Sequence, residues 1–237
     1  MPLHVLAVWG MPMSQLTSDA AIEATRDHRP LGAVVVAHPD DEILWCGGFL
    51  LTHPEFHWRI VTLSRALDVD RAPKFRRILR RFEADGEMAD LDDGPDQTPL
   101  PEEQLNGTVA RLVGGDRYDL IVTHGAMGEY STHRRHSECC KAVAAQWAAG
   151  IIDTRRLWMF AYTDCGRAYL PRVRADADWR DVLPGDIWLE KRRLITEIYG
   201  FAPDSWEART TPREEGFWCF DSTKGVEERL AERGQER

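Results

Sequence analysis

The sequence predicts an α/β fold in which a parallel β-sheet carries helices on both of its faces. Short apolar runs rich in β-branched residues alternate along the chain with segments whose apolar residues recur at helical spacing. Strands and helices that alternate in this way form parallel sheets, because each crossover helix packs on a face of the sheet. The chain has 237 residues, of which 43% are hydrophobic, and we expect one domain spanning 1–237.

The clearest strand is predicted at 33–37, where Ala-Val-Val-Val-Ala forms a short apolar run, and Leu-Ile-Val-Thr at 120–123 predicts a second of the same kind. Further strands are expected at 59–63, 88–91 and 157–162. The helices between them carry apolar stripes such as Phe75, Ile78 and Phe82. We expect helices at 41–51, 73–82, 102–113, after residue 136 through 147, and at 187–198.

Both ends of the chain differ from this alternating pattern. Residues 1–30 precede the first clear strand, and we expect an N-terminal extension that forms an added strand or helix or is partly disordered. Residues 221–237 are charged and poor in apolar side chains, which predicts a frayed helix or a charged tail.

The composition excludes several classes of protein. A net charge of −9 argues against bulk nucleic-acid binding. No apolar stretch approaches the roughly 20 residues that span a bilayer, and no basic segment precedes an apolar one at the N-terminus. We therefore expect a cytoplasmic protein that does not insert into membranes. Five scattered cysteines without a Cys-x-x-Cys pair predict no disulfide framework.

A histidine and two carboxylates follow the first predicted strand. In His38-Pro39-Asp40-Asp41-Glu42, His38 and Asp41 are three residues apart, so a tight turn lets both face one point. Because ligands bind at the carboxyl ends of strands in open α/β sheets, the pair predicts a divalent-metal site. Asp40 lies between them, and we expect it to hold a metal-bound water. The alternative is that these acidic residues only cap a helix and complement its positive end.

A second group of histidines follows the strand predicted at 120–123. His124 comes directly after this strand, and His133 and His136 follow a Gly-containing loop at the start of a helical pattern. A lone histidine there would be an ordinary polar or core residue. Two strand-to-helix junctions that both carry metal-ligand residues favour a shared site.

The segment Ala-His-Pro-Asp-Asp-Glu at 37–42, followed by Gly-Glu-Tyr-Ser-Thr-His-Arg-Arg-His at 128–136, resembles the PIG-L (LmbE-like) deacetylases. These are zinc-dependent N-deacetylases with a Rossmann-like sheet, many of which act on N-acetylglucosamine conjugates. The first motif is a full match. The second matches the family's His-x-x-His element, with Arg134-Arg135 where Pro-Asp is usual. The resemblance covers residues 33–199.

The resemblance implies a role for each motif residue. His38, Asp41 and His136 correspond to the zinc ligands, and Asp40 corresponds to the general base. His133 corresponds to the residue that stabilises the transition state, which it could do in its protonated form. Three protein ligands leave a position for a water whose pKa zinc lowers toward roughly 7. Two histidines and one carboxylate also suit Fe²⁺, so iron or another divalent metal remains an alternative to zinc.

The resemblance also suggests substrate contacts. An arginine after the second strand matches Arg76 or Arg77, and an acidic loop residue matches Asp93. Tyr130 lies near the family's loop tyrosine, although it is one residue further from the first histidine of the second motif. The alternative for Arg76 and Asp93 is a solvated basic helix face and a solvated acidic loop. We expect Arg135 and its neighbour to pair with acidic residues near a helix start, rather than to bind an anion on the substrate.

Together these features predict a metal-dependent hydrolase that removes an N-acetyl group from an amino sugar or its conjugate, a small-molecule substrate. Hydrolysis of another amide or an ester, or sugar binding without catalysis, are the alternatives. The sequence leaves the oligomeric state open.

Overall fold

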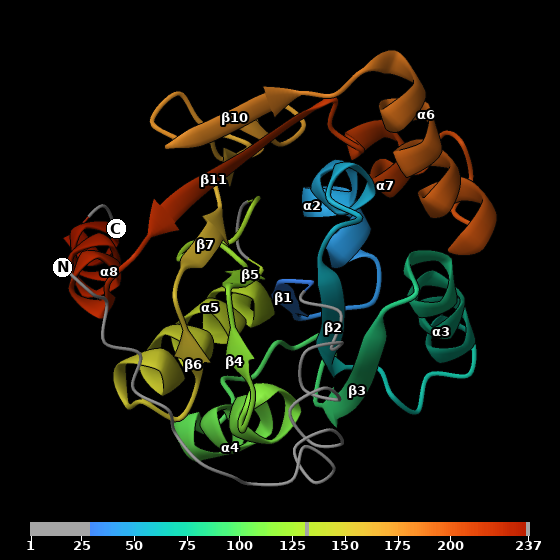
Figure 1. The fold of residues 1–237 in the computed structure, drawn as a ribbon. Helices are drawn as coiled ribbons and strands as arrows, with labels where there is room; N and C mark the ends of the chain where they lie inside the picture. Colours follow the sequence, from blue (N-terminus) through green and yellow to red (C-terminus); the bar gives the residue numbers. More distant parts are fainter. Residues whose placement is uncertain (1–28, 131–132, 236–237) are drawn as a thin grey trace, which may run out of the picture.

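The structure, a computed structural model, describes residues 29–130 and 133–235. Its centre is a seven-stranded sheet with the order β10-β11-β7-β5-β1-β2-β3 (Figure 1). Strands β7 to β3 in this order run parallel, whereas β10 and β11 are antiparallel to their neighbours. These strands are β1 (Leu31–Val36), β2 (His57–Ser64), β3 (Asp85–Leu91), β5 (Leu120–Thr123), β7 (Leu157–Phe160), β10 (Trp179–Val182) and β11 (Glu214–Phe220). The predicted α/β fold with a mostly parallel sheet is confirmed.

Helices cover both faces of the sheet (Figure 1). Along β1, Ala33 and Val35 pack into a core with α4, α5 and α8, whereas Val34 and Val36 pack on the other face with α2, α3 and the segment η1. Every side chain of β1 from Ala33 onward is buried, as expected for a central parallel strand. The helices are α2 (Asp41–Thr52), α3 (Arg71–Phe82), α4 (Glu102–Val113), α5 (Arg134–Ala148), α6 (Gly185–Arg193), α7 (Trp206–Thr210) and α8 (Thr223–Gln235), and a π-helical turn η1 (Leu194–Ile198) continues α6.

The structure adds elements that the sequence patterns did not predict. The strand expected at 157–162 divides into β7 and β8 (Tyr162–Thr163), and β8 pairs with β9 (Arg172–Val173). Two more short strands, β4 (Arg117–Tyr118) and β6 (Asp153–Thr154), pair with each other. Of the charged segment 221–237, residues 223–235 form α8, which packs through Val226 into the core. Residues 1–28 of the expected extension lie outside the described residues.

A break in α2 depends on a buried ion pair. The backbone of Cys46 leaves the helical range at φ −143°, so the turn that follows starts a new helix with free N–H groups. Glu215 on β11 accepts hydrogen bonds from two of them, Gly48 N and Phe49 N, both at 2.7 Å. Lys191 on α6 lies 2.7 Å from the same carboxylate, and both charged side chains are fully buried. The pair thereby fixes α2, the helix that begins at Asp41.

No helix in the described part of the chain is long and apolar enough to cross a membrane.

Candidate metal centre

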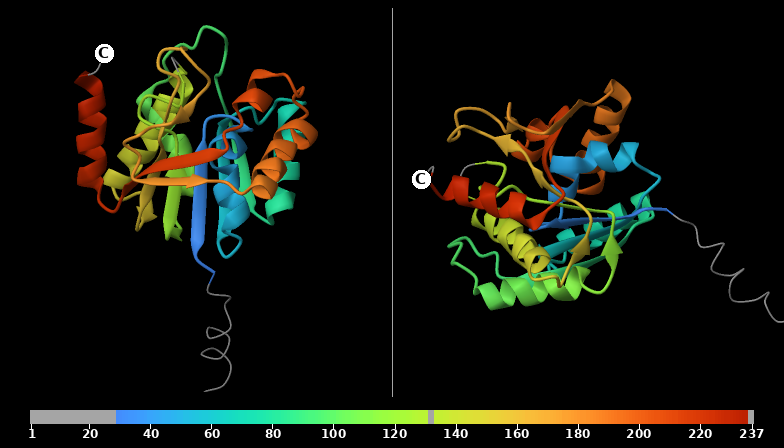
Figure 2. Two further views of the ribbon diagram at one scale, coloured as in Figure 1. Left: turned by 90° about the horizontal axis from the view of Figure 1, so that it is seen from above. Right: turned by 60° about the vertical axis from the view of Figure 1, so that its left-hand side comes forward.

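The candidate ligands meet at the carboxyl ends of β1 and β5, which are neighbours in the sheet. The chain continues from β1 to β2 on one side and from β5 to β7 on the other, so the strand order reverses between them. Such a switch point is where open α/β sheets bind ligands. The left view of Figure 2 shows the loop after β3 (green) at the same end of the sheet as the loop after β5 (yellow-green). His38 follows β1, and His133 and His136 lie at the start of α5.

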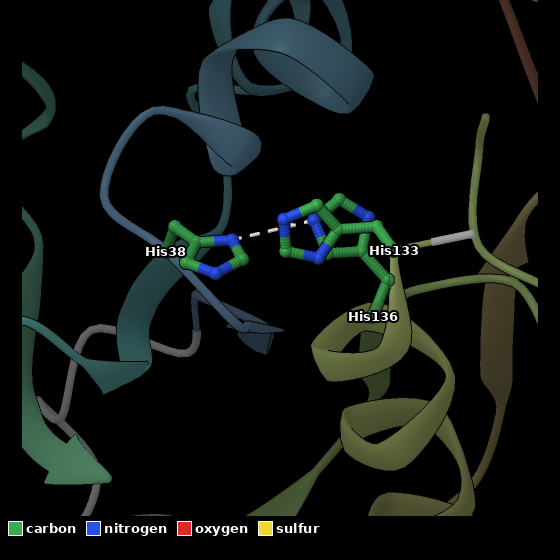
Figure 3. Close-up of side chains that lie close together, drawn as sticks. All are labelled: His38, His133 and His136. Atoms are coloured by element: carbon green, nitrogen blue, oxygen red, sulfur yellow. Dashed lines mark hydrogen bonds between the residues drawn. The ribbon is translucent and has the colours of Figure 1, made fainter. Parts of the chain in front are cut away.

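Three ligand atoms form a small triangle at this point. Asp41 Oδ2 lies 3.0 Å from His38 Nδ1 and 3.3 Å from His136 Nε2. The two histidine nitrogen atoms are 3.3 Å apart, and Figure 3 shows the rings of His38 and His136 on facing segments. Ligands about 2.0–2.1 Å from a tetrahedral zinc ion are separated by about 3.3 Å. The triangle therefore has the dimensions of one face of a tetrahedral metal site, and the three predicted ligands are brought together.

Two carboxylates orient the imidazoles of this triangle. His136 donates its Nδ1 hydrogen to Glu129 Oε2 at 2.5 Å, and His38 donates its Nε2 hydrogen to Asp93 Oδ1 at 3.1 Å. Each ring then presents the lone pair of its other nitrogen to the third ligand, Asp41. Imidazoles that bind metals usually have such a carboxylate partner, which fixes the tautomer and raises ligand basicity. Three lone pairs at this separation need a positive charge between them, so this donor set fits a divalent cation.

His124 supports the site without belonging to the triangle. It stacks on His136 with 3.9 Å between ring centroids and donates its Nδ1 hydrogen to Glu129 at 2.9 Å. Its Nε2 accepts the backbone N–H of Ala37 at 2.9 Å. Asp41, His124 and His136 also form a compact group of potential ligands. Because the His124 lone pair is already engaged, the triangle with His38 fits a metal ion better.

The ligand charges are mutually stabilised. Burial opposes the ionisation of Asp41, but its interactions with the neighbouring histidines, chiefly the charge of His136, outweigh it and hold the pKa of Asp41 well below the ordinary value. Burial lowers the pKa of His38, but hydrogen bonds to Asp41 and Asp93 outweigh this and raise it above 6.5. The pKa of His136 is raised in the same way, against burial, chiefly by the charge of Asp41. In the absence of a metal ion, protons therefore bind to the histidine nitrogen atoms, and a metal ion has to displace them.

Asp40 occupies a strained turn beside the triangle. Its backbone φ is 116°, a conformation that non-glycine residues rarely adopt. Its N–H is held by Glu42 Oε2 at 2.9 Å, and the hydroxyl of Tyr199 donates to the other oxygen of Glu42. The carboxylate of Asp40 accepts a hydrogen bond from Arg71 Nη1 at 2.5 Å. Burial and the charge of Asp41 raise the pKa of Asp40 to about 7, although Arg71 opposes this.

His133 lies beside the triangle, in surroundings that disfavour a charged ring. Its ring is 4.7 Å from that of His38 in a T-shaped contact, and its buried Nδ1 has no hydrogen-bond partner among the described residues. Burial, together with the charges of His136 and His38, lowers the pKa of His133 to about 3. These surroundings oppose the protonated form of His133 that the resemblance suggested, because a cation there would be desolvated next to other positive groups. A neutral ring still carries one N–H donor. His38, His133 and His136 also form a group that could hold a metal ion.

The site opens into a cavity of about 150 Å³, here called the metal cavity. Its lining includes Tyr130 and Asp93, as the sequence suggested, and the Asp93 carboxylate also contacts His38 and Arg65. Arg76 is exposed on α3 and does not line the cavity, and the same holds for its neighbour Arg77. The full lining is His38, Pro39, Asp40, Asp41, Leu44, Arg65, Arg71, Asp93, Tyr130, His133, Trp206 and Glu207.

Sequence reasoning missed three residues of the site. Glu129 was part of the second motif but was not assigned to the metal site, although a carboxylate seven residues before His136 is a natural partner for its ring. Arg65 follows β2 at the ligand-binding end of the sheet, and Arg71 begins α3 there. Arg135, in contrast, pairs with Glu138 at 2.5 Å, in agreement with the expected pairing to an acidic residue near a helix start.

Solved structures with similar folds were found, whereas no protein-family model and no curated protein matches the sequence. GalB, the 4-carboxy-2-hydroxymuconate hydratase from Pseudomonas putida KT2440, has a TM-score of 0.57 and 16% identity over 80% of this chain and 95% of its own. The conserved protein TT1542 from Thermus thermophilus has a TM-score of 0.54 and 19% identity, covering 78% of this chain and 93% of its own. The zinc-inhibited form of teicoplanin deacetylase Orf2 has a TM-score of 0.54 and 12% identity, covering 81% of this chain and 98% of its own.

The chain has a PIG-L-like fold. This confirms the resemblance at the level of architecture. Because a hydratase and a deacetylase share the fold, the reaction of this chain has to be argued from its own site.

Proposed function

We propose that this chain is a zinc-dependent N-deacetylase that removes an acetyl group from an amino sugar or its conjugate. The observation that carries the proposal is the triangle of His38, Asp41 and His136, with the carboxylate of Asp40 in the same cavity. A teicoplanin deacetylase of the same fold, crystallised in complex with teicoplanin, supports an acetylated conjugate as the substrate.

The donor set suits zinc, and Fe²⁺ is the second candidate, because two imidazoles and one carboxylate bind either ion. A zinc ion held there supplies Lewis acidity and makes water nucleophilic near neutral pH. Glu129 and Asp93 keep the ligand lone pairs of His136 and His38 directed at it.

The remaining chemistry belongs to side chains around the triangle. The carboxylate of Asp40 accepts a proton from the attacking water and later delivers it to the amide nitrogen as the C–N bond breaks, giving acetate and an amine. Arg71 holds the Asp40 carboxylate in place during both transfers. The neutral ring of His133 donates its N–H to the amide oxygen as that oxygen becomes negative.

The first experiment measures acetate release by zinc-loaded protein from a series of N-acetylglucosamine conjugates. Asp40→Asn should abolish release while it retains the metal content of the native protein, and His136→Ala should lose both. Asp153→Asn, at an exposed position on β6, is the matched control and should keep full activity. Repeating the assay with Fe²⁺ tests the choice of metal.

Two outcomes would contradict the proposal. Full metal occupancy in His136→Ala would remove this residue from the ligand set. Protein with metal bound that releases acetate from none of the conjugates would instead favour hydrolysis of another amide or an ester.

A further inference from the structure

A second cavity of about 500 Å³ adjoins the metal cavity, and we call it the distal cavity. Tyr130 and Trp206 line both cavities, so the two spaces meet at these side chains. Their rings form a T-shaped pair with 4.7 Å between centroids. The rest of the distal cavity comes from the segment between β8 and β9 and from α7: Asp164, Arg167, Tyr169, Leu170, Pro171 and Arg209.

The two cavities differ in charge. Four carboxylates line the metal cavity, and two arginines there pair with Asp40 and Asp93. The distal cavity has two arginines and one carboxylate, so it is basic in a chain whose net charge is −9. Arg209 in particular is exposed and pairs with no carboxylate of the described residues. An exposed guanidinium without a protein partner, beside a cavity, is available for a carboxylate or phosphate of a ligand.

Aromatic surfaces lie next to this charge. Trp206 is 38% exposed and Tyr169 is 37% exposed, and Arg172 stacks on the ring of Tyr169 at 4.8 Å. A half-exposed tryptophan at the junction of two cavities offers a flat face to a sugar or aromatic ring. A substrate whose acetamide lies at the metal centre would therefore pass Trp206 and end near Arg209.

We propose that the distal cavity binds the part of the substrate furthest from the acetyl group, and that this part carries an oxyanion held by Arg209. This inference rests on the proposed deacetylase function and narrows its substrate class to conjugates with an acidic aglycone.

The test compares a charged probe, 4-carboxyphenyl N-acetyl-β-glucosaminide, with its neutral methyl ester. The 4-phosphonophenyl analogue is a second anionic probe. Affinity is measured by calorimetry on zinc-loaded Asp40→Asn protein, and kcat/KM on the native protein. We expect at least one anionic probe to bind about fivefold tighter than the ester. This ratio corresponds to about 1 kcal/mol, which is the contribution of one partly exposed ion pair. Arg209→Gln should remove this preference. Arg117→Gln, an exposed arginine on β4, should leave it unchanged.

The outcomes separate the two proposals. Equal binding of charged and neutral probes, binding of none of them, or a preference that survives in Arg209→Gln would overturn the distal oxyanion site. Selective binding that Arg209→Gln abolishes, without acetate release from any probe by the native protein, would support the site and contradict the deacetylase function.

Discussion

Replacing Arg71 should shift the pH dependence of catalysis, because Arg71 holds the proposed base Asp40. Its Nη1 lies 2.5 Å from Asp40 Oδ2, and its guanidinium also stacks over Phe201 at 4.5 Å. The positive charge favours the ionised carboxylate and opposes the rise in the pKa of Asp40 to about 7 that burial and Asp41 cause. In Arg71→Gln this opposition is lost, so Asp40 should take up its proton at a higher pH.

The size of the change follows from Coulomb's law. Two charge centres about 4 Å apart interact by about 1 kcal/mol in water and about 4 kcal/mol at the effective dielectric constant of a protein surface. Because one pH unit corresponds to about 1.4 kcal/mol, the pKa should rise by between about one and three pH units. The side chain of Arg71 is 28% exposed, which places the expected value toward the lower end.

The assay is kcat/KM against pH from 5 to 9 at saturating metal. A general base must be deprotonated, so activity falls as the pH drops through its pKa, and the acidic limb of the profile should move to higher pH in Arg71→Gln. Arg71→Lys keeps a positive charge and should restore much of the native limb. Arg65→Gln removes the other arginine of the cavity, which pairs with Asp93, and should leave the limb in place. An acidic limb that does not move in Arg71→Gln would refute Asp40 as the titrating base.

Three further predictions concern the metal and the fold. Glu129→Gln should weaken metal affinity by about 10- to 100-fold, because it removes a carboxylate that orients a ligand imidazole. A competition assay with a chelator measures this affinity, and an unchanged value would exclude the orienting role of Glu129. Because the pKa values of His38 and His136 are raised above 6.5, metal binding should release protons and strengthen as the pH rises above that value. Calorimetry in buffers of different ionisation enthalpy measures the number of protons released, and a release of no protons would contradict the ligand set. Lys191→Met should lower the free energy of unfolding by about 3–5 kcal/mol, because it leaves the buried Glu215 carboxylate without its cation. Denaturant unfolding of metal-free protein measures this change, and a loss below about 1 kcal/mol would contradict a stabilising role of the ion pair.

The sequence located the metal ligands because their positions depend on local rules. A β-branched run predicts a buried strand, and parallel strands bring their carboxyl ends to one edge of the sheet. His38 after β1 and His136 after β5 therefore had to lie close together. The partners of their rings could not be predicted in the same way. Asp93 reaches His38 from the loop after β3, 55 residues further along the chain, and only the folded arrangement brings the two side chains together.

The arginine of the site shows how helix geometry limits such predictions. The resemblance pointed to Arg76, whereas the arginine that contacts Asp40 is Arg71 in the first turn of α3. Five residues along an α-helix correspond to a rotation of about 140° and an advance of about 7.5 Å. Arg76 therefore faces solvent when Arg71 faces the site. A basic helix pattern alone does not say which turn reaches the end of the sheet.

The antiparallel edge of the sheet was hidden for a different reason. Strand β11 begins with Glu214 and Glu215, and charged residues at this point disfavour a buried strand by composition. Glu215 is nevertheless fully buried, because Lys191 and two backbone N–H groups of α2 satisfy its carboxylate. The partners of such a group come from elements distant in the sequence, so its burial is decided by tertiary structure.

The distribution of charge around the triangle supports hydrolysis of a neutral amide. Most carboxylates near the metal cavity have a basic partner of their own: Arg71 for Asp40, Arg65 for Asp93, and histidines for Glu129. Asp41 contacts no arginine of the described residues and completes the triangle with two imidazoles. A divalent ion held there by one carboxylate and two neutral rings would keep part of its positive charge. That charge, together with the N–H donor of His133, would favour a carbonyl oxygen that becomes negative during the reaction over one that stays neutral.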